Sequence, residues 1–326
     1  WINIKMTNFK VLVSAPPILP QVIEYKSLCA NAGVDLITPD IFVKESLDEE
    51  ELIKYLRGMD GILCGDDELN SKVLQESHKH LKVISKWGTG IDSIDTESAK
   101  QLGIKVYRVK DVFGPPLSDT VMSYILLYSR KIFEKDFVVR NNDWKKITSY
   151  TLAERTIGIV GLGHVGKEVA RKASAFGMKV YFTDILDVDL EDEQSNYKKV
   201  NLEELLSVSD FVTIHCDLNE SSHHLFSKRE FDLMKDNSVV INTARGSIIN
   251  EEELICALEN KVIYGAALDV FEKEPLPENS KLRAMDNVFF SPHNSNGSVE
   301  TFRKVDKKAI NNIFEGLGLG KQDIFS

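Results

Sequence analysis

The sequence has no long apolar run and no excess of basic residues. No apolar stretch reaches the ~18–20 residues that a membrane-spanning helix requires, so we expect no membrane partner. The 40 Lys and Arg residues are outnumbered by 50 Asp and Glu residues, which gives a net charge of −10. Nucleic acids and anionic membranes attract basic surfaces, and the acidic balance argues against both. It still permits a small anionic substrate, because a local cationic pocket can outweigh the global field.

The sequence is also poor in cysteine and has no low-complexity tract. Its cysteines are far apart and show no CxxC spacing: Cys29, Cys64, Cys216 and Cys256. This pattern favours buried, reduced thiols in a cytoplasmic protein over a disulfide framework, and we expect no metal site. The first residues resemble neither a signal peptide nor a natural start. We expect Met6 to be the natural first residue and residues 1–5 to derive from a cloning vector.

What the chain does contain is a regular alternation of short apolar strands and helix-length amphipathic segments. At 326 residues it exceeds the usual size of one hydrophobic core, which predicts two domains. Most predicted strands are apolar throughout, as expected for parallel strands covered by helices on both faces. The pattern therefore predicts an α/β fold of two doubly wound parallel-sheet domains. The predicted strands are 10–14, 34–38, 61–64, 83–86, 105–107, 156–160, 179–183, 210–214, 238–241, 263–268 and 288–290.

Two prolines mark the expected domain break. Pro115 and Pro116 end the first series of strands, and a long helix over 118–128 follows, with Ser118 or Asp119 as its N-cap. A last amphipathic helix, about 298–316, comes after the final strand, where it could fold back on the first domain. We therefore predict a discontinuous domain of residues 6–116 and 297–326, with a second domain of residues 117–296 inserted in it. A small-molecule cleft is expected between domains.

A glycine turn in the second domain predicts a dinucleotide site. The strand 156–160 runs into the segment 161–166 (GLGHVG), and a helical pattern follows it. Gly161 would form the tight turn, Gly163 would let the backbone approach a pyrophosphate, and Gly166 would let the helix pack close to the strand. The helix N-terminus would add free N–H groups and the positive end of a dipole.

The next predicted strand, 179–183, ends at Asp184. A carboxylate at this position can accept hydrogen bonds from the adenosine ribose and would repel a 2′-phosphate. Ile185 and Leu186 follow it and supply no cation for such a phosphate. The sequence therefore favours NAD over NADP.

Three ionisable residues follow predicted strands of the second domain: Arg245, Glu274 and His293. Because the carboxyl ends of parallel strands meet at one edge, where the nucleotide lies, we expect them to converge beside the nicotinamide. A guanidinium can bind a carboxylate through two parallel hydrogen bonds. An imidazole can transfer a hydroxyl proton, and a carboxylate behind it can fix its tautomer. Each residue alone could be structural, but together they predict hydride transfer between NAD and a small 2-hydroxy acid.

These motifs resemble those of the D-isomer-specific 2-hydroxyacid dehydrogenase family, which includes phosphoglycerate, glycerate and D-lactate dehydrogenases. The most specific stretches are 158–166, 242–254 (NTARGSIINEEEL), 265–277 (GAALDVFEKEPLP) and 291–293 (SPH). The resemblance implies NAD as cofactor and a Rossmann NAD-binding domain inserted in a flavodoxin-like substrate domain. It also implies a homodimer built largely through the cofactor domains.

The resemblance further implies roles for individual residues. His293 would be the general acid/base paired with Glu274, and Arg245 would bind the substrate carboxylate. The loop after strand 83–86 would offer N–H groups to the same carboxylate, which makes the implied substrate-binding residues Lys86, Gly88, Thr89, Gly90, Arg245 and His293. Asp269 would meet the nicotinamide carboxamide. The implied cofactor-binding residues are Gly161, Gly163, His164, Val165, Gly166, Asp184, His215, Thr243, Ala244, Arg245, Asp269 and His293.

The sequence departs from the family pattern in several places. The family commonly has an acidic residue near Ser123 and a proline where this chain has Asp217. Phosphoglycerate enzymes tend to carry arginine and serine in the stretch where this chain has Asp66, Asp67 and Glu68. Three carboxylates would repel a phosphate, and we take them as an argument against a phosphorylated substrate.

The sequence leaves the 2-hydroxy acid open, together with two alternatives to the main hypothesis. One is an NAD-responsive scaffold like the corepressors of this family, which retain the same three ionisable residues. The other is a dehydrogenase variant that acts on phosphoglycerate, formate or phosphite. The main hypothesis remains an NAD-dependent oxidoreductase of small D-2-hydroxy acids.

Overall fold

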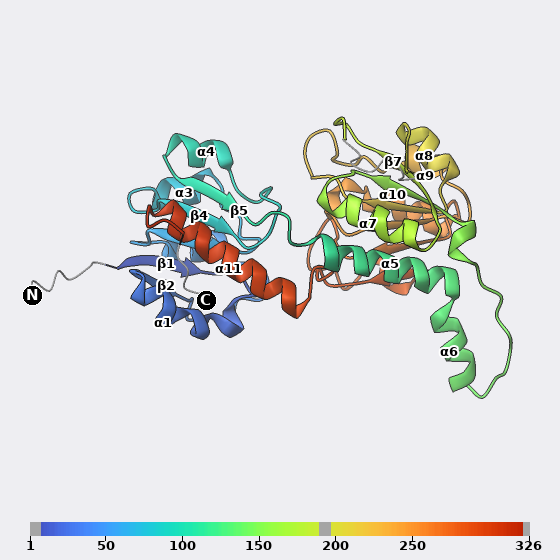
Figure 1. Ribbon diagram of the computed structural model, residues 1–326, viewed down its shortest axis with the longest axis horizontal. Coiled ribbons are helices and arrows are strands. Elements are labelled where there is room, and N and C mark those ends of the chain that lie inside the picture. The colour runs from blue at the N-terminus through green and yellow to red at the C-terminus, as the bar shows by residue number, and fades with distance from the viewer. Residues whose placement is uncertain (1–7, 189–196, 322–326) are drawn as a thin grey trace, which may run out of the picture. The chain divides into compact units, whose positions relative to one another are not determined.

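The computed structural model describes residues 8–188 and 197–321, so the expected start at Met6 lies outside the described residues. The chain divides into two compact units. Unit 1 comprises Trp1–Val112 and Ser298–Ser326, and unit 2 comprises Phe113–Gly297. Figure 1 shows the helices and strands of each unit.

Unit 1 contains a five-stranded parallel sheet with the strand order β2-β1-β3-β4-β5, which is the flavodoxin-like order. Its inner strands contribute completely buried apolar side chains, among them Leu12, Ile62 and Ile84. The elements are β1 Phe9–Val13, α1 Val22–Asn31, β2 Val34–Ile37, α2 Glu49–Tyr55, β3 Gly61–Cys64, α3 Ser71–Ser77, β4 Val83–Lys86, α4 Thr96–Gln101, β5 Lys105–Arg108 and α11 Val299–Gly316.

The C-terminal helix α11 belongs to unit 1. Its Ala309 carbonyl accepts a hydrogen bond from the Ser85 hydroxyl at 2.9 Å. Its Asp306 carboxylate is fully buried and accepts hydrogen bonds from the Trp87 indole at 2.7 Å and the Tyr25 hydroxyl at 3.1 Å. These contacts attach the end of the chain to the sheet formed by its beginning, which makes unit 1 discontinuous in sequence.

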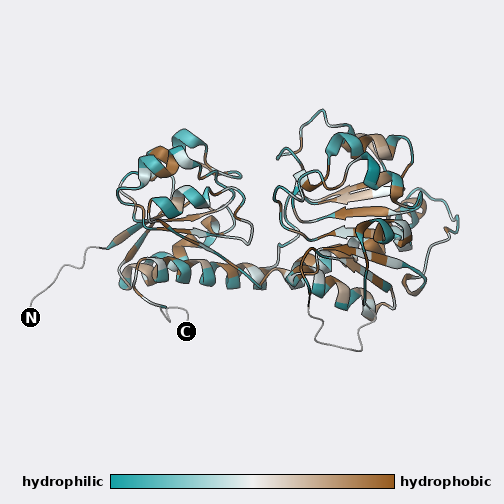
Figure 2. Cartoon of the chain, turned by 90° about the horizontal axis from the view of Figure 1, so that it is seen from above, coloured by the Kyte–Doolittle hydropathy of each residue, from teal (hydrophilic) through white to brown (hydrophobic). Residues whose placement is uncertain are grey.

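Unit 2 has, in its described part, a seven-stranded parallel sheet with the order β12-β11-β10-β9-β6-β7-β8. Counted from β6, this is the Rossmann order with one added strand, and the order reverses between β6 and β9. Figure 2 shows apolar strands inside the layers of helices. The elements are α5 Gly114–Arg130, α6 Ile132–Arg140, β6 Thr156–Val160, α7 His164–Ala175, β7 Lys179–Thr183, β8 Tyr197–Lys199, α8 Leu202–Val208, β9 Phe211–Ile214, α9 Lys228–Leu233, β10 Val239–Asn242, α10 Glu251–Glu259, β11 Gly265–Leu268 and β12 Val288–Phe290.

The secondary structure differs from the prediction in two places. The prolines 115 and 116 do not precede the long helix but form its first turn, so α5 starts at Gly114 and neither Ser118 nor Asp119 is its N-cap. Proline is tolerated there because the first N–H groups of a helix have no intrahelical acceptor. Strand β8 was not predicted at all, because its three residues are mostly polar and lie at the edge of the sheet.

In the described part of the chain, every helix is too short or too polar to cross a lipid bilayer. All four cysteines carry free thiols, and Cys29 and Cys64 are buried as predicted. Cys216 is half-buried, and Cys256 is exposed. The prediction of a buried thiol is wrong for Cys256, because α10 turns Leu254 and Leu258 into the core and leaves Cys256 on its solvent side.

Candidate active site

The glycine turn lies between β6 and α7, and two of its glycines are required by the protein itself. Gly161 has a φ of +92°, and a Cβ there would lie 2.7 Å from the Cys216 backbone nitrogen. A Cβ at Gly166 would lie 2.2 Å from the Gly161 carbonyl oxygen. The helix and the turn therefore approach too closely for a side chain at either position.

Gly163 differs from its two neighbours in the turn. It is the N-cap of α7 with a φ of −74°, and a Cβ there would meet no protein atom within 4 Å. The space faces the helix N-terminus, where first-turn N–H groups point outward and the dipole favours an anion. The fold alone gives no reason for glycine here, whereas a pyrophosphate lying against the turn would.

Thr243, directly after β10, has a buried hydroxyl that the described residues leave unpaired. The residue is 7% exposed, and its Oγ1 has no hydrogen-bond partner in the described part of the chain. Burying an unpaired hydroxyl costs about 1–3 kcal/mol. The unpaired hydroxyl at Thr243 and the open space at Gly163 both fit a bound dinucleotide.

Asp184 lies directly after β7 and contacts the glycine turn. Its Oδ2 accepts the Leu162 N–H at 2.7 Å, and its Oδ1 accepts the Leu186 N–H at 2.9 Å. Each carboxylate oxygen has two lone pairs. The carboxylate is therefore fixed beside the turn, and each of its oxygens retains a lone pair for a ribose hydroxyl.

His215 follows β9, on the other side of the point where the strand order reverses. Burial lowers the pKa of its imidazole to about 3, so the ring is neutral at physiological pH. Its Nε2 shares a hydrogen bond with the Thr213 hydroxyl at 2.8 Å. A neutral ring adds no positive charge to this part of the site.

The three ionisable stretches predicted to converge follow adjacent strands. The register pairs Asn242 at the end of β10 with Leu268 at the end of β11, and Leu268 with Phe290 at the end of β12. Arg245, Glu274 and His293 come after these strand ends. They therefore start from one edge of the sheet, the same edge to which β6 delivers the glycine turn.

The structure brings His293 and Glu274 into direct contact. The His293 Nδ1 lies 2.8 Å from Glu274 Oε2, and Glu274 Oε1 accepts the Phe271 N–H at 3.0 Å. Because a carboxylate only accepts, Nδ1 carries the proton and Nε2 is the basic nitrogen of the neutral ring. A Cβ at Gly246 would lie 1.9 Å from the Phe271 carbonyl carbon. The turn that carries Arg245 thus packs directly on the loop that carries Glu274.

The Arg245 turn is held by a buried amide that the sequence analysis did not single out. Asn242 is completely buried, and its Nδ2 donates to the Arg245 carbonyl at 2.8 Å. Its Oδ1 accepts the Ala244 N–H at 3.0 Å, while Arg245 Nη1 donates to the Ala244 carbonyl at 2.8 Å. One side chain therefore spans the whole turn. One feature of the sequence could have identified Asn242: it is an amide residue at the end of an otherwise apolar strand, Val-Val-Ile-Asn.

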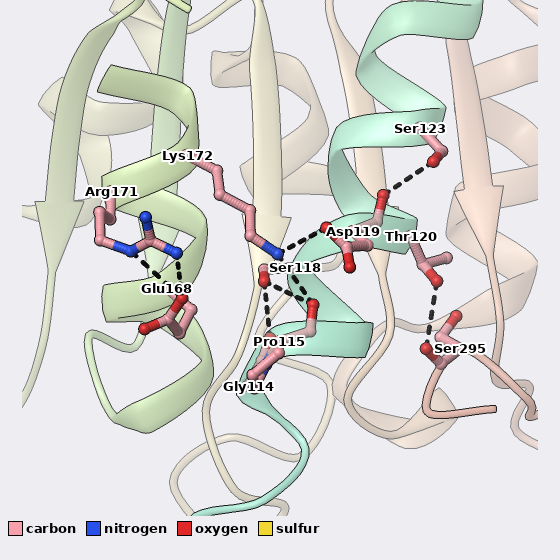
Figure 3. A network of polar contacts seen from close by, with 10 residues as sticks. All are labelled: Gly114, Pro115, Ser118, Asp119, Thr120, Ser123, Glu168, Arg171, Lys172 and Ser295. Atoms are coloured by element: carbon pink, nitrogen blue, oxygen red, sulfur yellow. Dashed lines mark hydrogen bonds and ion pairs between the residues drawn. The ribbon is translucent and has the colours of Figure 1, made fainter. Parts of the chain in front are cut away.

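Asp269 holds the backbone around His293. His293 has a φ of +49°, and its N–H donates to the Asp269 carbonyl at 2.8 Å. The buried Asp269 carboxylate accepts the N–H groups of Asn294 at 2.8 Å and Ser295 at 3.0 Å. The Thr120 hydroxyl on α5 donates to the Ser295 carbonyl at 3.1 Å (Figure 3). These contacts stabilise the left-handed backbone at His293, while the contact of Asp269 with a carboxamide remains a prediction.

The family is decided by comparison with known proteins. The family model described as "D-isomer specific 2-hydroxyacid dehydrogenase, NAD binding domain" matches residues 122–295. This chain belongs to the D-isomer-specific 2-hydroxyacid dehydrogenase family. The predicted family is thereby confirmed, and so is NAD as the cofactor.

Relatives of this dehydrogenase match most of its length. It is 36% identical over 286 residues to the glyoxylate reductase of Thermofilum pendens, covering 84% of each chain. It is 34% identical over 281 residues to the hydroxypyruvate reductase of Thermotoga maritima, covering 84% of this chain and 90% of that one. The solved D-lactate dehydrogenase of Aquifex aeolicus, complexed with NAD and lactic acid, has a TM-score of 0.82 at 25% identity and covers 95% and 96%. The two parallel sheets with their covering helices match the α/β fold predicted from the sequence.

In unit 1 of this dehydrogenase, Lys86 is the last residue of β4 and is 2% exposed. Its Nζ donates to the Gly65 carbonyl at 2.5 Å and pairs with the Asp66 carboxylate at 2.5 Å. In the loop that follows, Gly88 has a φ of +155°, and the Thr89 hydroxyl donates to the Val109 carbonyl at 2.8 Å. The charge of the Lys86 ammonium is therefore balanced by Asp66 within unit 1. The role of the loop in substrate binding remains a prediction.

The structure removes two residues from the argument based on the carboxylates at positions 66–68. Asp67 is fully buried and accepts hydrogen bonds from the Ser14 hydroxyl at 2.7 Å and the Leu47 N–H at 2.9 Å. Its burial raises the pKa of its carboxyl group. Because Asp66 pairs with Lys86, Glu68 is the one residue of the three that still supports the argument against a phosphorylated substrate.

The departure at Ser123 has a simple structural account. The Ser123 hydroxyl donates to the Asp119 carbonyl one turn earlier in α5, at 2.8 Å. The Asp119 carboxylate pairs with Lys172 on α7 at 2.6 Å (Figure 3). This face of α5 therefore carries its negative charge at Asp119, four residues before the position where the family commonly has it.

Proposed function

We propose that this dehydrogenase interconverts a small 2-oxo acid and the corresponding D-2-hydroxy acid, with glyoxylate or hydroxypyruvate as substrate. The contact of 2.8 Å between His293 Nδ1 and Glu274 Oε2 carries this proposal, because it orients an imidazole at the carboxyl edge of the NAD-binding sheet. Relatives named glyoxylate reductase and hydroxypyruvate reductase support the substrate class. Because the corepressors of this family retain the same residues, turnover of a 2-oxo acid is what separates this chemistry from cofactor binding alone.

NADH, when bound, would supply the hydride for C2 of the 2-oxo acid. His293, protonated on both nitrogens, gives its Nε2 proton to the C2 oxygen as the C=O bond becomes a C–O bond. Glu274 keeps the Nδ1 proton in place and stabilises the charged ring before transfer. Arg245 binds the substrate carboxylate through two parallel hydrogen bonds and polarises the adjacent carbonyl. In the reverse direction neutral His293 takes the hydroxyl proton.

The same proposal includes cofactor preference and substrate anchoring. Asp184 would bind the ribose hydroxyls and repel a 2′-phosphate, which favours NAD over NADP. The N–H groups of the loop that contains Gly88, Thr89 and Gly90 would bind the substrate carboxylate from unit 1. Glycines allow a close approach of backbone to ligand there.

The test is NADH oxidation with glyoxylate, hydroxypyruvate and pyruvate, and NAD reduction with formate and phosphite. We expect turnover with glyoxylate or hydroxypyruvate. We expect His293→Ala to lower kcat by about 10²–10⁴-fold while NADH still binds. Arg245→Lys should weaken substrate binding and slow turnover, since the planar two-point contact is lost. Tight NADH binding without turnover of any 2-oxo acid would favour the scaffold and refute the proposal.

We also propose that the chain forms a homodimer through unit 2. Helix α6 has no buried residue, and its Phe137 is 67% exposed. Ile132, Phe133 and Val139 on the same helix are also exposed, as is Trp144 just after it. Several exposed apolar side chains on one helix favour an interaction site there. Light scattering should show a dimer for the wild type and a monomer for Phe137→Glu, and an unchanged mass for the variant would contradict this proposal.

A further inference from the structure

Unit 1 presents a short loop, residues 87–90, at the carboxyl edge of its sheet, directly after β4. Gly88, Thr89 and Gly90 are each half-buried, so a small ligand can reach the loop from solvent. In the described part of the chain, the N–H groups of Thr89 and Gly90 have no acceptor in the protein. The direction in which these N–H groups point therefore decides whether the loop can hold an anion.

Two carbonyl groups of the loop are bound to the end of β5. The Gly88 carbonyl accepts the Val109 N–H at 2.8 Å. The Thr89 carbonyl accepts a hydrogen bond from Nη1 of Arg108, the last residue of β5, at 3.1 Å. The Thr89 hydroxyl donates to the Val109 carbonyl at 2.8 Å. The loop is thus attached to residues 108 and 109 through its carbonyl side.

The geometry of the peptide group then fixes the direction of the N–H groups. A trans peptide group is planar, and its C=O and N–H point in opposite directions. The peptide groups that join Gly88 to Thr89 and Thr89 to Gly90 are both trans. Because both carbonyls point towards residues 108 and 109, the N–H groups of Thr89 and Gly90 point away from β5. Successive N–H groups that point to the same side form a concave site for an anion.

Arg108 contributes something that the other contacts do not. The bonds of Val109 to Gly88 and Thr89 already attach the loop to the end of β5. Arg108 binds the carbonyl of the peptide group whose N–H belongs to Gly90. A hydrogen bond from a charged donor is roughly twice as strong as one from a neutral donor, and successive hydrogen bonds polarise one another. The guanidinium therefore orients the Gly90 N–H and makes it a stronger donor.

The charge of Arg108 acts in the same direction. The register of β4 and β5 makes Lys86 and Arg108 Cα partners at the ends of the two strands. Lys86 pairs with Asp66 at 2.5 Å, which balances the charge of the ammonium. Arg108 forms no ion pair in the described part of the chain, so its charge is left beside the loop. A positive charge there favours an anion over a neutral ligand.

We propose that Arg108 is a positioning residue for the substrate carboxylate. It orients and polarises the peptide group between Thr89 and Gly90, through which the loop binds the carboxylate. The guanidinium acts through this peptide group and does not itself touch the substrate. This inference rests on the proposed function, in which the same loop anchors a 2-oxo acid.

The test is the steady-state reduction of glyoxylate or hydroxypyruvate by NADH in two variants of the full chain. Arg108→Met removes both the donor and the charge, and Arg108→Lys keeps both. We expect Arg108→Met to raise KM about tenfold and to change kcat less than about twofold, because a contact made equally in the ground state and the transition state affects KM alone. Arg108→Lys should bring KM back to within about threefold of the wild type, since a charged donor is retained. The Kd for NADH should be the same in all three proteins.

Lys105→Met is the matched control. Lys105 is a cation on the same strand that also donates to a backbone carbonyl, that of Gly316 at 3.2 Å. Its removal should leave KM and kcat unchanged, because Gly316 belongs to α11 and not to the loop. A wild-type KM in Arg108→Met would overturn the proposal. The same rise of KM in Lys105→Met would also overturn it, since the effect would then come from the fold or from net charge.

Oxamate, a 2-oxo acid analogue that NADH does not reduce, separates this inference from the proposed function. The change in NADH fluorescence measures the Kd of oxamate in the enzyme–NADH complex. If the wild type turns over no 2-oxo acid but binds oxamate, and Arg108→Met weakens that binding about tenfold, the proposed function fails and the role of Arg108 stands. Turnover together with an unchanged oxamate Kd in Arg108→Met would overturn the role of Arg108 alone. A wild type that binds no oxamate would overturn it as well.

Discussion

The Gly163→Ala substitution separates what the fold requires from what the cofactor requires. Gly163 has a φ of −74° and a ψ of −158°, a conformation open to alanine, and its Cβ would meet no protein atom within 4 Å. Replacing glycine by alanine at an N-cap costs at most about 1 kcal/mol. The lower entropy of the unfolded alanine chain returns about 0.4–1 kcal/mol. We therefore expect the free energy of unfolding to change by less than about 0.5 kcal/mol.

The same methyl group would occupy the place predicted for the pyrophosphate. Forcing one extra carbon into a closely packed contact costs about 1–3 kcal/mol, which corresponds to an increase of about 5–150-fold in the Kd for NADH. Fluorescence titration with NADH measures this change, and urea unfolding without NADH measures stability.

Gly161→Ala is the matched control, because its Cβ would lie 2.7 Å from a backbone nitrogen and its φ is +92°. It should lose more than about 2 kcal/mol of stability, since a strained backbone and overpacking act together. Wild-type NADH affinity in Gly163→Ala would refute the reasoning. So would a loss of stability like that of the control.

Three further predictions concern ionisable residues. Glu274→Gln should lower kcat/KM for the 2-oxo acid about 10–100-fold in steady-state assays, because one amide oxygen cannot accept from both His293 and Phe271; an unchanged kcat/KM would remove Glu274 from the mechanism. Asp184→Ala should reduce the ratio of kcat/KM for NADH over NADPH by about tenfold or more, and a constant ratio would place ribose recognition elsewhere. Burial lowers the pKa of His215 to about 3 from 6.5, so below pH 6.5 the unfolded chain binds this proton more readily and the wild type loses stability as the pH falls towards 3. His215→Asn should lose less free energy of unfolding between pH 7.5 and 5 in urea titrations, and an equal loss would contradict the burial of the ring.

Much of the fold was predictable because its signals are local. The strands 61–64, 83–86, 156–160, 179–183 and 288–290 were predicted with the bounds that the structure has. An apolar run in a parallel sheet is buried on both faces, so the pattern does not depend on its neighbours. Strand β8 escaped prediction because a short polar edge strand is defined by its pairing with β7, which the sequence does not reveal.

The sequence by itself determined the family, the glycine turn and the residue types of the candidate site. Which atoms those residues meet was decided by tertiary structure alone. Lys86 is neutralised by Asp66, Asp67 faces the core, and Asp269 binds the backbone beyond His293. The contacts of Lys86 with Asp66 and of Asp269 with Asn294 join residues more than 15 positions apart. Asp66 and Asp67 are adjacent in sequence, yet only Asp67 is turned inward. Spacing along the chain fixes which strand end a side chain follows, but contacts of this kind form only where segments distant in sequence have been placed side by side.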